Sequence, residues 1–156
     1  MQNDFRAERA ASLVARFMTL IGPSLACYID DSGIWSRPGT EAIKLALADL
    51  SSDLRSLYER AGLLHDRLVE YPSPQVEYPI RFSALHDIDL GYLLPQLLAE
   101  GREQVSAVDA MAASEASAEE SVAEVVEFLR EAHTAIQSHV DVLAGLADAP
   151  QAAARA

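Results

Sequence analysis

The chain has 156 residues, of which 50% are apolar and 23% are charged. This length and composition fit one globular domain with a sizeable core and exclude a disordered chain. Acidic residues outnumber basic ones by 24 to 12, so the net charge is −12. Nucleic-acid binding is not expected, because contacts to phosphates need clustered Lys and Arg. The sequence shows no membrane-spanning run and no basic amphipathic segment, so we expect a cytoplasmic protein without membrane contact.

The first predicted helix covers residues 4–30. Phe17 and Ile21 are among its apolar residues, and their spacing places them on one helical face. Gly22 and Pro23 predict a kink, because proline has no amide hydrogen to donate to the preceding turn. Cys27 is the only cysteine, so the chain cannot form an intrachain disulfide or a thiolate metal cluster. Its apolar surroundings indicate a small buried side chain.

The clearest helical signal covers residues 40–71. Apolar residues recur there at alternating intervals of four and three, at Ile43, Leu47, Leu50, Leu54, Leu57, Ala61, Leu64 and Leu68. This heptad pattern predicts a helix with one apolar seam that packs against other helices. Pro72 ends the pattern, because proline cannot continue the helical hydrogen bonding.

Two further helices are predicted over residues 84–112 and 117–148, each with its own apolar stripe. The alternating apolar pattern of a half-buried sheet strand is missing. Four helices with one stripe each predict an all-α protein, a single four-helix bundle over residues 1–148. We expect a disordered tail over residues 149–156.

The link over residues 71–83 is longer than neighbouring helices need. In an extended conformation it reaches about 40 Å, close to the ~43 Å length of a helix of about 29 residues. We therefore slightly prefer a ferritin-like topology, with a crossover between the second and third helices, over a simple up-down-up-down order. We also expect an ordered strap in which Tyr78, Ile80 and Phe82 cover helix grooves, because alternate residues of an extended segment face one side.

The histidines leave two interpretations open. No acidic residue stands three positions before any histidine, so the Glu-x-x-His motifs of a carboxylate-bridged di-iron site are missing. His86 and His139 come to similar heights if the last two helices form an antiparallel pair. With Asp89 they can then hold a divalent metal, and His65 and Glu8 join them only if the second and third helices are antiparallel. Otherwise the histidines are packing residues at the margins of apolar stripes.

Two surface features bear on partners. Residues 100–131 contain nine acids and two arginines, which indicates either a solvated face or a docking site for a basic protein. The preceding segment is apolar almost all round, and Leu94 and Leu98 point away from its main stripe. These two leucines pack either beneath the 71–83 link or against a second copy of the chain.

The leading functional hypothesis is a non-catalytic helical bundle that acts as an interaction or structural module. We expect it to self-associate as a homodimer, with Leu94 and Leu98 in the interface and no cofactor. The alternative is a bundle of ferritin-like architecture that binds a divalent metal or haem through the histidines described above.

Overall fold

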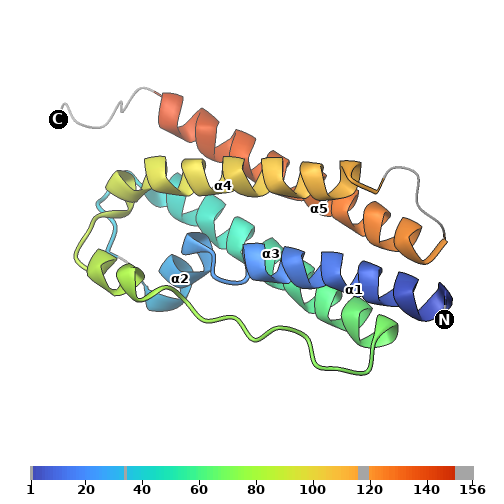
Figure 1. Cartoon of the computed structure of the whole chain (residues 1–156). Coiled ribbons are helices and arrows are strands. Elements are labelled where there is room, and N and C mark those ends of the chain that lie inside the picture. The colour runs from blue at the N-terminus through green and yellow to red at the C-terminus, as the bar shows by residue number, and fades with distance from the viewer. Residues whose placement is uncertain (1, 34, 116–119, 150–156) are drawn as a thin grey trace.

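The computed structural model describes residues 2–33, 35–115 and 120–149 (Figure 1). All regular structure in this part of the chain is helical, which confirms the all-α prediction. The elements are α1 (Gln2–Ile21), α2 (Leu25–Ser32), α3 (Glu41–Leu68), the 3-10 helix η1 (Ile80–Leu85), α4 (Leu90–Ala113) and α5 (Glu120–Asp148). Apart from Ala149, the predicted tail over residues 149–156 lies outside the described residues.

The long helices run in two directions. The amide of Leu90, at the start of α4, donates to the carbonyl of Trp35 just before α3, so α3 and α4 begin at the same end of the bundle. At the other end, Arg9 near the start of α1 pairs with Glu115 just after α4, at 2.8 Å. Figure 1 shows the link between α3 and η1 running back along the length of the bundle. α3 and α4 therefore point one way, while α1 and α5 point the other.

The predicted first helix is interrupted where the sequence indicated a kink. α1 ends at Ile21 and α2 begins at Leu25, with a bend of 49° between the two helices. Ser24 starts the second helix, because its side-chain oxygen accepts from the amide of Cys27. Gly22 is required at the break: a Cβ there would lie 2.8 Å from the Met18 carbonyl oxygen. The expected kink is thus a complete helix break, and Cys27 is buried as predicted.

The fourth α-helix begins later than the sequence indicated. The prediction placed its start at residue 84, but α4 starts at Leu90 and is preceded by η1 and a turn. Asp89 sets this boundary, because its carboxylate accepts the amide of Gly91 and, across the bundle end, the amide of Arg37. His86 consequently lies in a turn and not on the helix.

The link behaves as a strap in part. Phe82 is buried at 5% exposure and its ring lies 5.2 Å from that of Tyr28. Tyr78 donates to a carboxylate oxygen of Asp31 at 2.9 Å. Ile80, however, is 90% exposed, so its expected packing is wrong. The alternation assumed an extended chain, and the 3-10 helix that begins at Ile80 turns this side chain outward.

The core is continuous through all the long helices, and Phe17 of α1 meets Phe128 of α5 edge to face with ring centroids 5.1 Å apart. α4 and α5 approach closely at Gly101, where a Cβ would lie 2.7 Å from a methyl carbon of Val140. No single helix in the described ranges is long and apolar enough to cross a membrane. Only the bent pair Asp4–Ile21 and Leu25–Ser32 meets that criterion, and only when the two are taken together.

Candidate functional site

The structure gives the two leading histidines different partners. His86, in the turn before α4, has its Nε2 2.6 Å from the hydroxyl oxygen of Tyr28 on α2. His139, on α5, has its Nε2 2.5 Å from a carboxylate oxygen of Asp53 on α3. Across the described residues, no group of three or more His, Cys, Asp or Glu side chains is arranged to hold a metal ion. Each histidine is thus engaged in a pairwise contact between two elements.

The conditional ligands are also dispersed. His65 lies near the end of α3 that is opposite the start of α4, so it is far along the bundle from His86. It is buried beneath the ring of Tyr71, and its Nδ1 has no hydrogen-bond partner in the described part of the chain. Glu8 is exposed on α1, and Asp89 is occupied as the N-cap of α4. The structure therefore does not assemble the predicted set of ligands.

The predicted interface leucines are covered within one chain. Leu94 and Leu98 are 6% and 7% exposed, so these side chains cannot form a self-association surface. By helical spacing they share a face of α4 with Gly101, which packs against Val140 of α5. The close α4–α5 contact buries this second apolar face, whereas the prediction assumed one apolar stripe on each helix.

The described acidic residues within 100–131 do not form a single exposed acidic surface. Three of these residues form ion pairs with arginines of other helices, namely Glu115 with Arg9, Glu124 with Arg67 and Glu131 with Arg60. These pairs lie on different sides of the bundle, because Arg9 belongs to α1 and the other arginines to α3. Three of the nine acids thus form ion pairs within the chain.

Glu100 has a separate structural role. Its carboxylate accepts the amide of Leu25 at 2.8 and 3.0 Å, at the start of α2. Burial raises the pKa of Glu100 to about 7, although the hydrogen bonds from Leu25 and Ala26 and the charge of Arg81 act in the opposite direction. The carboxylate ties α2 to α4, as expected for an acid at a helix N-terminus.

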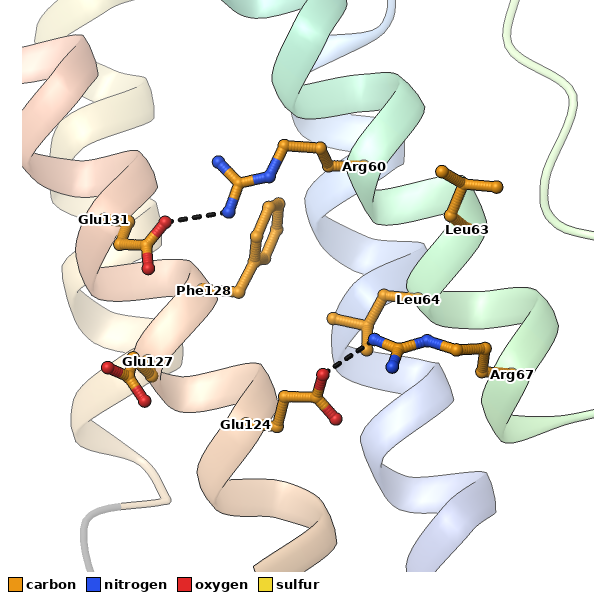
Figure 2. Close-up of a pocket in the computed structure, with 8 residues that line it drawn as sticks. All are labelled: Arg60, Leu63, Leu64, Arg67, Glu124, Glu127, Phe128 and Glu131. Carbon is orange, nitrogen blue, oxygen red and sulfur yellow. Dashed lines mark hydrogen bonds and ion pairs between the residues drawn. The ribbon is translucent and has the colours of Figure 1, made fainter.

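A groove of about 530 Å³ lies between α3 and α5. Figure 2 shows its lining residues, which are Arg60, Leu63, Leu64 and Arg67 from α3 and Glu124, Glu127, Phe128 and Glu131 from α5.

Ion pairs bridge this groove around an apolar centre. Arg60 pairs with Glu131 at 2.8 Å and Arg67 with Glu124 at 2.7 Å. The ring of Phe128 lies between the two helices, with the Arg60 guanidinium 5.3 Å from its centroid. The groove thus combines exposed ion pairs with an aromatic ring that is itself buried, since Phe128 is 6% exposed.

Leu63 extends this surface onto the outer side of α3. Leu63 lies at the edge of the groove, on the side of α3 away from α5 in Figure 2, and it is 67% exposed. Leu45 is 68% exposed on the same helix. The two leucines are eighteen residues apart, which is about five helical turns and places them on one line.

Sequence periodicity does not point to either leucine, because neither belongs to the heptad seam. The sequence feature that identifies them is their spacing of eighteen residues, which places both leucines on one line, on the helix side opposite the seam. Phe128 was missed for a similar reason, since it lies at the margin of the apolar stripe of its helix.

Comparisons with protein-family models, with curated proteins and with solved structures found no match for this chain. The candidate site therefore rests on its own geometry.

Proposed function

We propose that this protein is a non-catalytic helical-bundle interaction module that self-associates as a homodimer. The observation that carries the proposal is the pair of exposed leucines on the outer face of α3, Leu45 and Leu63. This face replaces the one expected around Leu94 and Leu98, which are buried.

Burial of these leucines supplies a driving force for association. Removing apolar surface from water contributes about 25 cal/mol per Å², or about 1.5–3 kcal/mol for a large aliphatic side chain that becomes fully buried. In a symmetric dimer both copies use the same patch, so each leucine position contributes two buried side chains. The arginines of the neighbouring groove, Arg60 and Arg67, are exposed and enlarge the surface that a second copy can contact.

We also propose a ferritin-like connectivity for the bundle, in which α1 and α2 together count as one broken helix. The common direction of α3 and α4, with the long link between them, supports this assignment. The proposal concerns architecture and implies no di-iron chemistry.

Light scattering of the full chain over a range of micromolar concentrations tests the self-association. We expect a mass that rises from one chain to two. Leu63→Ala and Leu45→Ala should each weaken association about tenfold or more, because every substitution truncates two side chains per dimer. Ile80→Ala is the matched control, since Ile80 is also a large aliphatic residue and is even more exposed, at 90%, but lies on η1. A chain that stays monomeric at high micromolar concentration contradicts the proposal.

A further inference from the structure

We infer that two copies of this chain pack through α3 in an antiparallel, two-fold arrangement centred near Leu54. The inference rests on the proposed self-association and adds its geometry and register. It is carried by the pattern of apolar, charged and small side chains along the outer face of α3.

The two exposed leucines define the centre line of this face. Leu45 and Leu63 are equally distant from Leu54 along the helix. A two-fold axis at that level therefore places Leu45 of one copy against Leu63 of the second copy, and the same contact recurs by symmetry. Both leucines are about two-thirds exposed in one chain, so this contact removes apolar surface that nothing in the described chain covers.

One pair of opposite charges on α3 favours the same register, although Glu59, which is exposed on the other side of the leucine line, comes level with Asp49 of the second copy. Asp49 and Arg60 are exposed and eleven residues apart, or about three turns, so they lie on the same side of the leucine line. In the antiparallel arrangement Asp49 of each copy approaches Arg60 of the other. A parallel, in-register pair would place like charges opposite each other, which is unfavourable. The guanidinium of Arg60 has donors to spare beyond its exposed pair with Glu131.

Small side chains occupy the middle of the face. Ala48, Ser52 and Ser56 are all exposed between the two leucines. Their size lets two helix backbones approach closely, and the proposed register brings Ser52 of one copy opposite Ser56 of the other. The centre of the face therefore fits a second copy of the same helix better than it fits a bulky side chain.

Cysteine cross-linking tests the register directly. In a Cys27→Ala background, Ser52→Cys and Ser56→Cys variants are prepared separately, mixed in equal amounts and mildly oxidised. We expect disulfide-linked dimers that contain one of each variant, formed several-fold faster than dimers of either variant alone. A Ser106→Cys variant, with its cysteine exposed on α4, should remain uncross-linked and is the control for random collision.

Charge reversal provides an independent test by sedimentation equilibrium. Asp49→Arg alone should weaken the dimer about tenfold, because it creates two repulsive pairs. Adding Arg60→Asp should restore the affinity to within about threefold of the original. Glu103→Gln, which removes an exposed charge on α4 and away from the α3 face, should leave the affinity unchanged. Circular dichroism of each variant checks that the fold is retained.

The outcomes separate this inference from the proposed function. A dimer in which like variants cross-link preferentially, or in which the double charge reversal fails to restore affinity, overturns the antiparallel register but leaves self-association standing. A chain that stays monomeric overturns both, and the α3 face is then either free or covered by a different protein.

Discussion

The two long sides of α3 differ in what they carry and in what covers them. The side toward α2 and the link presents polar residues, Ser51, Arg55 and Tyr58, yet it is covered in part, and Ser51 is fully buried. Ser51 and Arg55 both donate to Asp30 at 3.0 Å, and the Tyr58 hydroxyl donates to the carbonyl of Pro74 at 3.3 Å. The outer side carries the two exposed leucines and is bare.

This difference shows that the polarity of a helix face does not by itself decide whether the face is buried. Polar side chains can be covered when the covering segment supplies partners, because buried polar groups must be hydrogen-bonded. Apolar side chains stay exposed when no segment of the same chain reaches them. Hence, substitutions on the covered side should lower the stability of the fold clearly, whereas the ion pairs beside the bare side should contribute little to it.

The largest effect is expected from Phe82→Ala on the covered side. The buried ring packs against Tyr28, and its removal leaves a cavity, so unfolding should become easier by about 2–4 kcal/mol. Chemical denaturation measures this change. Ile80→Ala, two positions earlier and exposed, should change stability by less than about 0.5 kcal/mol. Equal effects for the two variants would show that the link does not pack as described.

Glu100→Gln should reveal that Glu100, whose carboxylate contacts the start of α2, makes a pH-dependent contribution to the stability of the fold. The folded-state pKa of about 7 lies above the ordinary value of 4.5, so the folded chain binds the proton more tightly than the unfolded chain. The contribution of Glu100 to the stability of the fold is therefore greatest below about pH 4.5, and it is lost as the pH rises through about 7.

The glutamine variant stays neutral at every pH. It should be more stable than the original chain by about 1–3 kcal/mol at pH 8 and nearly equal to it at pH 5. Thermal unfolding at the two pH values measures this, with Glu103→Gln, an exposed neighbour, as the control. A difference that is the same at both pH values would contradict a raised pKa.

A smaller effect is expected from Tyr78→Phe, which removes the hydroxyl that donates to Asp31. The loss should be about 0.5–1.5 kcal/mol, the usual net contribution of one hydrogen bond. Burial, followed by the hydrogen bond to Asp31, raises the pKa of Tyr78 to about 12. Ultraviolet titration should show one tyrosine that ionises late, and Asp31→Asn should lower its pKa. If the late-ionising tyrosine persists in Tyr78→Phe, the assignment is wrong.

The smallest effect is expected from the ion pairs between α3 and α5. Asp53→Asn removes the carboxylate that His139 contacts, and the cost should stay below about 1 kcal/mol because Asp53 is exposed. Arg67→Gln should behave similarly, and added salt should reduce both effects. A loss of several kcal/mol from either variant would mean that this side is held together as tightly as the covered one.

Local periodicity was enough to predict the long helices in outline, but not η1 or the start of α4. The heptad seam of residues 40–71 corresponds to α3, and Pro72 follows its end by a few residues. The break near Pro23 was also anticipated in position. These features depend on backbone hydrogen bonds and side-chain spacing within a few residues, so the local sequence contains the information.

Only the tertiary structure decided which surfaces are closed and which side chains meet. The start of α4 depends on Asp89 accepting an amide from Arg37, which is far away in the sequence. Leu94 and Leu98 are buried because α4 approaches α5 closely at Gly101. The exposure of Leu63 likewise depends on how far α5 and the link reach around α3. Each outcome requires a partner from a distant segment, and a one-dimensional pattern of apolar and polar residues does not specify which segment arrives.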